Sequence, residues 1–460
     1  MVVDRATIVA CCTAVGGSGG SLALIRVSGP DAHAIVSARA HCSHGKPLKD
    51  QLSHTVHHGF IKDQQGMTLD EVLFIIMHGP RTFTGEDTVE ITCHNNLLIV
   101  EAICRELIAA GARQAQRGEF SEQAFLNNKM DLAQAEAIHD LIHATTEAGL
   151  RASLAQLSGT LSHHMATIEQ QLLKLTAWCE VTFEFVDEMG DFRQTIQDQL
   201  GVIVGAVTAV ERSFSSQVQI KEGMRIALVG SVNAGKSSLF NRLLGRERSI
   251  VTPVAGTTRD TIEGTVARRG VAWTFIDTAG LRMTDDPIER EGILRSWREA
   301  QTADLILLVV DSTRPLTSEE SARYGELCQE HGDKIIIVEH KADNHSYAFD
   351  PKQHKLASLP VSSLTLQGLA ELEALMHTKI GALFAEQGVP FLINQRHQRV
   401  LREVTEILQQ VVDAVHVAEP AYELISAQLQ TAVALIGEVT GKTVGEGALD
   451  RIFREFCIGK

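Results

Sequence analysis

The sequence has no apolar run long enough to cross a lipid bilayer, although 44% of its 460 residues are hydrophobic and 22% are charged. Its first residues, MVVDRATIVACC, lack the basic stretch, the sustained apolar segment and the small-residue cleavage site of a secretory signal. We therefore expect a globular, cytoplasmic protein with no membrane partner. The length indicates about three domains.

The eight cysteines include no C-x-x-C spacing, which argues against both a disulfide framework and a zinc ribbon. Positive charge is not in excess either, because the sequence has 42 Lys and Arg but 57 Asp and Glu, which gives a formal net charge of −15. Lys and Arg supply most of the non-specific affinity for nucleic acid. This charge balance therefore argues against a protein that coats nucleic acid without sequence preference. Any contact with RNA is expected to be local or shared with a partner.

Proline is absent between Pro80 and Pro253, and much of this gap carries apolar residues at helical spacing. The spacing predicts long helices over residues 132–218 and again over 391–460, with a break near Pro420. Between these blocks lie segments typical of buried parallel strands, namely MRIALVG, WTFIDTAG, LILLVVD and KIIIVEH. Before them, SLALIRVSG, EVLFIIMHG and DTVEIT are also typical of strands, and a helical segment follows Asn96.

These patterns predict a multidomain protein. We expect an α+β domain over residues 1–118, and a discontinuous α-helical domain whose first part covers 119–220 and whose second part covers 384–460. An α/β domain with a doubly wound parallel sheet is expected as an insertion over 221–383, because its strands alternate with helical segments.

A phosphate-binding loop is the clearest motif. Residues 230–237 read GSVNAGKS, which fits G-x-x-x-x-G-K-[ST] between a strand and a helix. The glycines let backbone N–H groups surround phosphates. Lys236 is expected to neutralise β- and γ-phosphate oxygens, and the hydroxyl of Ser237 to ligate Mg²⁺.

Two further motifs fit a GTPase. VTPVAGTTRD supplies Thr257 and Thr258, one of which is expected to complete the Mg²⁺ shell when the γ-phosphate is present. Residues 277–280, DTAG, offer the carboxylate of Asp277 to the magnesium's water shell and the N–H of Gly280 to the γ-phosphate. Together with the phosphate-binding loop they predict a GTPase-type nucleotide site.

Guanine specificity requires a carboxylate that accepts the two donors on the guanine edge, and Asp343 of EHKAD has this chemistry. The usual pattern is Asn-Lys-x-Asp, and His340 stands here where asparagine is expected. Histidine can still donate a hydrogen bond. The sequence Val361-Ser362-Ser363 after the next strand is either a backbone contact to the base or an ordinary loop.

The residue that orients the attacking water is not evident. Many small GTPases have glutamine shortly after the DTAG glycine, whereas Leu281 and Arg282 follow here. Glu289 in TDDPIERE is a candidate, with a solvated charged helix start as the alternative. Asn233 lies within the phosphate-binding loop, where its side-chain oxygen can face a monovalent cation that takes the place of an arginine finger.

Motifs along the whole chain resemble one family. NAGKSS, AGTTRD and DTAGLR lie in the central segment, the terminal residues are FCIGK, and the preceding segment contains DRATIVA, IRVSGPDA, RTFTGEDTVEITCH and GEFSEQAFLNNKMDLAQAEAIHDLI. Together they resemble the MnmE (TrmE) family of tRNA modification GTPases from about residue 4 to the last residue. AVGGSGG stands where the family has a loop close to PPGRGG, and CHNN where it has CHGG.

The resemblance implies an N-terminal domain similar to tetrahydrofolate-binding domains. It implies that 5-formyltetrahydrofolate or a related folate contacts Arg26, Glu90, Lys129 and Lys460, and that Cys457 takes part in the modification. If the resemblance is set aside, the alternative for Arg26 and Glu90 is surface ion pairing. Cys457 would then be a small buried hydrophobic residue, and Lys460 an unstructured terminus.

In the GTPase domain, the resemblance implies a potassium ion and a magnesium ion. The potassium ligands would be Asn233, Thr252, Val254 and Thr257, and the magnesium ligands would be Ser237 and Thr258. The predicted catalytic residues are Glu289, Lys236 and Cys457. The predicted GTP contacts are Asn233, Ala234, Gly235, Lys236, Ser237, Ser238, Thr252, Pro253, Val254, Ala255, Gly256, Thr257, Thr258, Asp277, Thr278, Ala279, Gly280, His340, Lys341 and Asp343.

The resemblance also implies partners. It predicts a homodimer that forms a heterotetramer with the FAD-dependent protein MnmG (GidA) and places an aminomethyl-type group on the wobble uridine of tRNA, with the folate as one-carbon donor. Two other classes remain open. A ribosome-assembly GTPase of the Era or Der type carries a basic RNA-binding module, whereas the flanks of this chain are acidic. A scaffold with a degenerate nucleotide site is favoured by His340 alone.

Overall fold

The computed structural model describes residues 6–16, 20–43, 45, 47–184, 193–214, 223–245, 262–268, 271–277, 301–344, 346–347, 356–385, 391–417 and 419–459. The chain forms two compact units. The first comprises Met1–His139, Gln156–Val207 and Arg399–Lys460, and the second comprises Asp140–Ala155 and Thr208–Gln398. Among the described helices, none has both the length and the apolar character that a membrane span requires.

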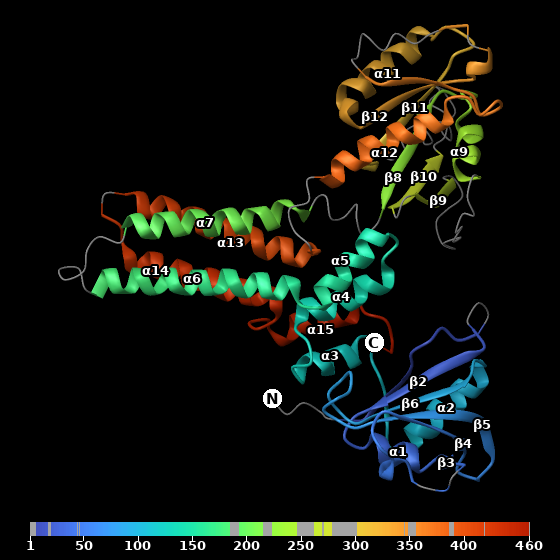
Figure 1. Ribbon diagram of the computed structural model, residues 1–460, viewed down its shortest axis with the longest axis vertical. Helices are drawn as coiled ribbons and strands as arrows, with labels where there is room; N and C mark the ends of the chain where they lie inside the picture. The colour runs from blue at the N-terminus through green and yellow to red at the C-terminus, as the bar shows by residue number, and fades with distance from the viewer. Residues whose placement is uncertain are drawn as a thin grey trace. The chain divides into compact units, whose positions relative to one another are not determined.

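The N-terminal part of the first unit is a seven-stranded sheet in the order β3-β4-β5-β6-β2-β1-β7 (Figure 1). Neighbouring strands are antiparallel except for the parallel pair β1 and β7. The elements are β1 (Ile8–Cys11), β2 (Leu22–Ser28), α1 (Ala32–Ser37), β3 (Ala40–Cys42), η1 (Leu48–Asp50), β4 (Thr55–Lys62), β5 (Thr68–Met77), β6 (Thr88–His94), α2 (Leu97–Ala109) and β7 (Arg113–Gln114).

One core holds this sheet and its helices together. Ile25 of β2 and Phe74 of β5 are fully buried with Val36 of α1 and Ile103 of α2 in a single apolar cluster. The side chain of Asn96 accepts a hydrogen bond from the backbone N–H of Leu98 and so caps α2. The strands predicted at SLALIRVSG, EVLFIIMHG and DTVEIT and the helix predicted after Asn96 are confirmed as β2, β5, β6 and α2.

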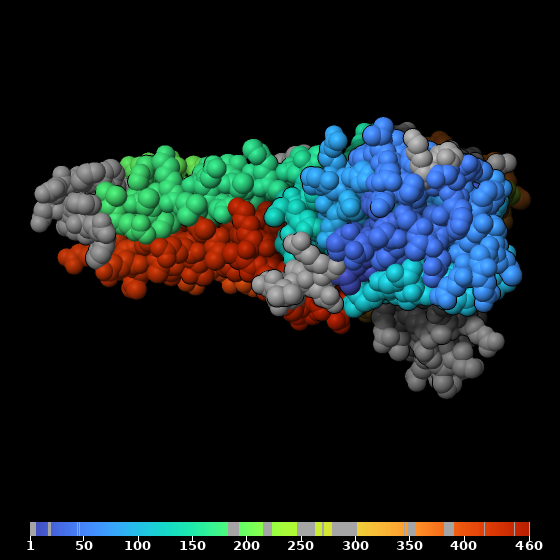
Figure 2. Space-filling model, turned by 90° about the horizontal axis from the view of Figure 1, so that it is seen from below, coloured from blue at the N-terminus to red at the C-terminus, as the bar shows by residue number. Residues whose placement is uncertain are grey.

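The predicted helical blocks are confirmed. The bounds are α3 (Glu119–Leu126), α4 (Leu132–His143), α5 (Glu147–Leu157), α6 (Thr160–Glu184), α7 (Arg193–Arg212), α13 (Gln395–His416), α14 (Tyr422–Thr440) and α15 (Glu446–Arg454). α6 packs along α14, with Glu180 bonded to Ser426 and Glu169 paired with Lys442. Figure 2 shows the green and red segments of this bundle side by side, although they are far apart in the sequence.

The second unit contains a six-stranded sheet in the order β13-β12-β11-β8-β10-β9. Its elements are β8 (Met224–Gly230), α9 (Lys236–Leu244), β9 (Ile262–Arg268), β10 (Val271–Asp277), β11 (Leu305–Asp311), α11 (Ser318–His331), η2 (Gly332–Lys334), β12 (Ile335–His340), η3 (Ala342–Asn344), β13 (Ser358–Val361) and α12 (Leu369–Ala385). α9 and α12 pack on one face of the sheet and α11 on the other, as a doubly wound fold requires.

The sequence pattern predicted a parallel sheet, but one of the described strands is antiparallel. β9 pairs antiparallel with β10, whereas β10, β8, β11, β12 and β13 are mutually parallel. β9 lies at the edge of the sheet, where an antiparallel strand needs no crossover helix.

Candidate functional site

The phosphate-binding loop joins β8 to α9 at the carboxyl edge of the parallel strands. Gly235 has a φ of +96°, in the left-handed region that favours glycine. A Cβ atom at this position would lie 2.1 Å from Nδ1 of His340, so only glycine leaves room for that ring. Ser237 and Ser238 lie in the first turn of α9, where unpaired backbone N–H groups favour an anion.

Lys236 is buried at the start of α9. Its Nζ donates to the carbonyl oxygens of Gly230 at 3.1 Å and Ser231 at 3.0 Å. Burial lowers the pKa of the Lys236 ammonium, and the carboxylate of Asp277 works against this shift. Asp277 ends β10, and its Oδ1 is buried with no hydrogen-bond partner within the described part of the chain. A buried ammonium beside an unpaired carboxylate oxygen fits a phosphate and a hydrated cation.

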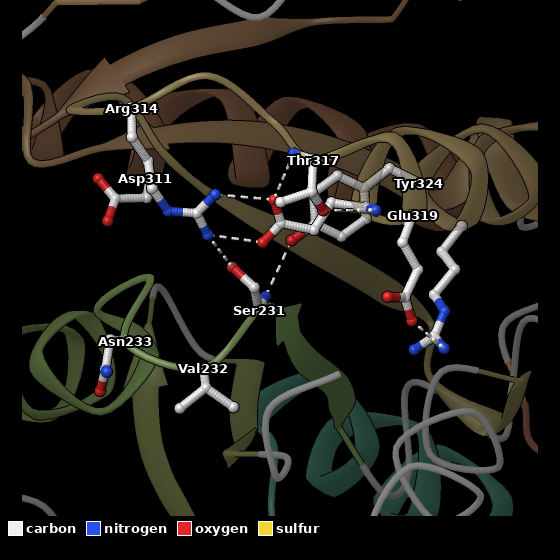
Figure 3. Close-up of a pocket in the computed structure, with 10 residues that line it drawn as sticks. Ser231, Val232, Asn233, Asp311, Arg314, Thr317, Glu319 and Tyr324 are labelled. Atoms are coloured by element: carbon white, nitrogen blue, oxygen red, sulfur yellow. Dashed lines mark hydrogen bonds and ion pairs between the residues drawn. The ribbon is translucent and has the colours of Figure 1, made fainter. Parts of the chain in front are cut away.

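A cavity of about 520 Å³ adjoins the first half of this loop (Figure 3). Its other walls come from the end of β11 and the start of α11. The lining residues are Ser231, Val232, Asn233, Asp311, Arg314, Thr317, Glu319, Glu320, Arg323 and Tyr324. Figure 3 shows Asn233 directed away from the group of side chains around Arg314.

A hydrogen-bond network ties α11 to the phosphate-binding loop. Arg314 donates to both carboxylate oxygens of Glu320, at 2.6 Å and 2.8 Å, and lowers the pKa of Glu320 to about 2. Arg314 also lies 3.5 Å from Oγ of Ser231, and the backbone N–H of Ser231 donates to the hydroxyl of Tyr324 at 2.9 Å. Sequence reasoning missed these residues; the T-x-x-E capping box formed by Thr317 and Glu320 was the available signal.

His340, at the end of β12, bridges two loops. Its Nδ1 lies 2.9 Å from the carbonyl oxygen of Ala234, and its Nε2 lies 2.7 Å from Oγ of Ser363. A carbonyl oxygen can only accept, so Nδ1 carries the proton and Nε2 accepts from the serine hydroxyl. Burial lowers the pKa of His340, and the hydrogen bond to Ala234 opposes this shift. The ring is therefore neutral at pH 7, and both of its nitrogens have protein partners.

The other residues of the predicted guanine motif lie beside His340. Asp343 accepts a hydrogen bond from the hydroxyl of Ser362, in the loop after β13. Nζ of Lys341 lies 2.6 Å from Oδ2 of Asp311. Partial burial disfavours ionisation of Asp311, but the hydrogen bonds from Lys341 and Thr313 outweigh it and lower the pKa of the Asp311 carboxyl. The structure thus brings the phosphate-binding loop, the EHKAD segment and the serine pair together.

Several predicted residues lie outside the described residues. They are Thr252, Pro253, Val254, Ala255, Gly256, Thr257, Thr258, Thr278, Ala279, Gly280, Glu289 and Lys460. Of the proposed potassium ligands, the structure describes Asn233, and of the proposed magnesium ligands it describes Ser237.

In the first unit, Arg26 and Glu90 form a cross-strand pair between β2 and β6. Nε of Arg26 lies 2.9 Å from Oε1 of Glu90, and the two side chains are 14% and 16% exposed. The rings of Phe83 and Phe120 lie 5.3 Å and 5.5 Å from the guanidinium carbon. The ion pair is therefore partly buried and packs on two aromatic rings, unlike the surface ion pair that the alternative interpretation predicts.

Lys129 and the C-terminal segment meet the same unit at other points. Nζ of Lys129 donates to the carbonyl oxygen of Pro80 at 2.8 Å. Near the C-terminus, the backbone N–H of Gly118 donates to the carbonyl oxygen of Cys457, and Arg117 forms an antiparallel bridge with Ile458. The terminal FCIGK motif is therefore paired with the segment that leads into α3.

Comparisons with known proteins agree over almost the whole chain. Residues 7–129 match the family model of the GTP-binding protein TrmE N-terminus, and residues 132–457 match that of the MnmE helical domain. The tRNA modification GTPase MnmE of Lachnoclostridium phytofermentans is 35% identical over 466 residues and 99% of each chain. That of Salinibacter ruber is 36% identical over 99% of each chain, and that of Symbiobacterium thermophilum is 37% identical over 97% of this chain and 98% of its own.

With both of its flanking regions and its full length matched in this way, the chain belongs to the MnmE (TrmE) family of tRNA modification GTPases.

Proposed function

We propose that this GTPase uses GTP hydrolysis to drive modification of the wobble uridine of tRNA, acting with the FAD-dependent protein MnmG (GidA). The reaction would place an aminomethyl-type group at the uridine 5-position, with a tetrahydrofolate as one-carbon donor. The observation that carries the GTPase part is the buried ammonium of Lys236 beside the unpaired Oδ1 of Asp277. Family membership carries the tRNA part.

The donor set at the loop fits Mg²⁺, because the orphaned Oδ1 of Asp277 is an acceptor of the kind that a hydrated cation satisfies. Ser237 and Thr258 would hold the ion, which supplies positive charge against the β- and γ-phosphates. Lys236 would neutralise a phosphate oxygen, and the backbone N–H groups at the start of α9 would fix the phosphate chain. Asp343 and its partner Ser362 would present an acceptor to the guanine edge.

Potassium is proposed as the second cation, with Asn233, Thr252, Val254 and Thr257 as ligands. Asn233 has a φ of +62°, a conformation that asparagine tolerates better than most residues, and it lies at the cavity beside the loop. Leu281 offers no polar group to orient water, so a charge from a cation and a carboxylate such as Glu289 would supply what glutamine and an arginine finger supply elsewhere.

Replacing Na⁺ by K⁺ at constant ionic strength should raise GTP turnover about tenfold or more, because a bound cation stabilises charge that develops in the transition state. Phosphate release under saturating GTP and Mg²⁺ measures this. Asn233→Gly keeps the left-handed backbone but removes the amide, and should abolish the preference for K⁺. Asn128→Gly, at another left-handed asparagine with a φ of 53°, should keep it. Equal turnover of wild type in both salts would rule out the potassium model and favour an Era- or Der-like switch.

The folate is proposed to bind at Arg26, Glu90, Lys129 and Lys460. Cys457 is proposed to take part in the modification. The segment from Pro80 to Gly85 supports this grouping, because Phe83 underlies Arg26 while Pro80 accepts a hydrogen bond from Lys129. Gly85 leaves space for Lys129 as well, since a Cβ there would lie 3.3 Å from that side chain. Guanidinium and ammonium groups fit the carboxylates of a folate, and Glu90 fits its ring N–H groups.

Calorimetry with 5-formyltetrahydrofolate tests this site. Arg26→Ala should weaken binding about tenfold or more, since it removes a charged hydrogen-bond donor. Arg39→Ala is the matched control, because Arg39 and Glu106 form an ion pair in the same unit with the same Nε–O distance of 2.9 Å and 16% exposure on each side. No binding by wild type, or equal weakening in both variants, would contradict the proposal.

We propose further that residues 1–118 form the folate-binding and dimerisation domain, 119–220 and 384–460 the helical domain, and 221–383 the G domain. The homodimer would assemble with MnmG into a heterotetramer in the cytoplasm. The net charge of −15 on each chain makes a shared rather than a solitary contact with tRNA the physically favoured arrangement.

A further inference from the structure

Three side chains outside both proposed sites meet at one end of the N-terminal sheet. His33 is the second residue of α1, His78 follows β5, and Asp87 precedes β6. Met77 of β5 is directly opposite Thr88 of β6 in the antiparallel ladder, so the residues that flank this pair, His78 and Asp87, are neighbours. The start of α1 is held here because the N–H of Gly29 donates to the carbonyl oxygen of Asp87 at 3.0 Å.

The three side chains converge through their ligand atoms. Nε2 of His33 lies 3.9 Å from Oδ2 of Asp87, and Nδ1 of His78 lies 4.0 Å from Oδ1 of the same carboxylate. One ligand atom from each residue lies within 4.8 Å of the others, the single such group of three among the described residues. Tetrahedral bonds of about 2.1 Å to one ion require separations of about 3.4 Å, which small side-chain rotations can reach.

The protonation of His78 suits a metal ligand. Its Nε2 lies 3.0 Å from the carbonyl oxygen of Gln51, which can only accept, so Nε2 carries the proton. Nδ1 then has a free lone pair, and this atom faces Asp87. Metal-binding histidines characteristically donate their other ring N–H to a backbone carbonyl in this way.

His33 is the buried member of the group. The residue is 6% exposed, and its Nδ1 is buried without a hydrogen-bond partner among the described residues. Its Nε2 lies 3.2 Å from the carbonyl oxygen of Met77, which can only accept, so without an ion Nε2 carries the proton and Nδ1 has the lone pair. An ion at Nε2 would require that proton to move to Nδ1, after which Nε2 and the carbonyl oxygen would both face the ion. The ring stacks on that of His78 with 4.5 Å between centroids.

We propose that His33, His78 and Asp87 form a site for a divalent transition metal, with Zn²⁺ as its occupant and the carbonyl oxygen of Met77 as a fourth donor. Two imidazoles with a carboxylate and a carbonyl oxygen suit Zn²⁺ and its spectroscopic substitute Co²⁺ better than Ca²⁺ or Mg²⁺, which favour oxygen alone. The ion would pin the start of α1 to the adjacent ends of β5 and β6, and this stabilising role is separate from the nucleotide and folate sites.

The test uses the full-length chain without an affinity tag, stripped of metal with a chelator. Titration with Co²⁺ is followed by visible absorption, and Zn²⁺ is measured by competition. Wild type should bind one ion per chain at this site. His78→Gln and Asp87→Asn, two partly exposed positions where the replacements preserve polarity, should each weaken binding about 10- to 100-fold. His58→Gln is the matched control, since His58 is also paired with a carboxylate in the same sheet.

The chain has 19 histidines, so the comparison between variants is decisive and not the stoichiometry alone. Zn²⁺ should also raise the midpoint of thermal unfolding of wild type and His58→Gln, but not of His78→Gln. No saturable ion in wild type, or equal affinity in wild type and all three variants, would overturn the proposal. The readouts do not depend on GTP, folate or tRNA, so failure here leaves the proposed function untouched.

Discussion

Replacing Lys236 by alanine will lower GTP turnover by about 10²- to 10³-fold while leaving the chain folded. The ammonium of Lys236 is the buried cation at the base of the phosphate-binding loop, held by the carbonyl oxygens of Gly230 and Ser231. Burial lowers the pKa of the Lys236 ammonium, and a bound phosphate would supply the negative charge that its two carbonyl partners do not. Phosphate release under saturating GTP measures the loss.

Lys379 provides the matched control. Its Nζ also donates to two backbone carbonyl oxygens, those of Asp333 at 2.9 Å and Ile335 at 3.1 Å, and burial also lowers the pKa of Lys379. Both alanine variants should therefore lose about 1–3 kcal/mol of unfolding free energy in urea, since each removes charged hydrogen bonds. Only Lys236→Ala should lose turnover. Normal turnover in Lys236→Ala would remove this residue from the phosphate site.

The same two variants also test the proposed function in cells. In cells that lack this protein, wild type and Lys379→Ala should restore the modified wobble uridine, and Lys236→Ala should not. Nucleoside analysis of purified tRNA measures the outcome. Unchanged wobble-uridine chemistry in cells without the protein would contradict the tRNA part of the proposal, whatever the variants do in solution.

The phosphate-binding loop could be predicted because its chemistry is local. A buried β-branched strand, a glycine at a left-handed position and a lysine at the start of a helix are adjacent in the sequence. Helices were predictable for a similar reason, since Leu401, Val404, Leu408 and Val411 recur at helical spacing and are all buried in α13.

Contacts between distant segments could not be predicted in this way. Tyr324 lies 93 residues from Ser231, and no motif links them. β9, IEGTVAR, was missed because it is a short, half-polar edge strand whose pairing partner decides its structure. Apolar spacing predicts the helix but not its burial, since Leu150 and Leu154 of α5 are 42% and 48% exposed. Periodicity predicts the type of element, but tertiary packing decides which face is covered.

His340 shows most clearly which contacts cannot be predicted from the sequence. The sequence marked it as a departure from the asparagine of the guanine motif, and predicted a donor for the nucleotide. In the structure its two ring nitrogens bond to Ala234, 106 residues away, and to Ser363. Its partners are a backbone carbonyl and a hydroxyl in separate loops, which no spacing in the sequence reveals. We therefore interpret His340 as the residue that holds the phosphate-binding loop against the loop after β13.

Replacing His340 by alanine should lower nucleotide affinity about tenfold or more and cost about 2–5 kcal/mol of unfolding free energy. The substitution leaves the buried carbonyl oxygen of Ala234 and the hydroxyl of Ser363 without their partner and opens a cavity beside Gly235. Binding of a fluorescent GTP analogue and unfolding in urea measure the two effects. His340→Asn, which restores a short amide donor toward Ala234, should recover part of both losses.

The protonation of His340 adds a dependence on pH with a definite sign. Burial lowers the pKa of His340 in the folded state below its ordinary value of 6.5, so the unfolded chain takes up its proton first as the pH falls. The contribution of His340 to stability is thus complete above pH 6.5 and is lost progressively between 6.5 and the lower folded-state pKa. Protonation would also place a proton on Nε2, which now accepts from Ser363.

Nucleotide affinity in wild type should therefore weaken only at a pH well below 6.5, as the folded protein takes up a proton at the lowered pKa of His340. Burial also lowers the pKa of His33 and His164, so the pH dependence of stability has several sources. The difference between wild type and His340→Asn isolates one of them, because asparagine does not titrate. Parallel pH profiles for the two proteins would show that His340 does not change protonation in the folded state, and a steeper profile for His340→Asn would contradict the bridge between the two loops.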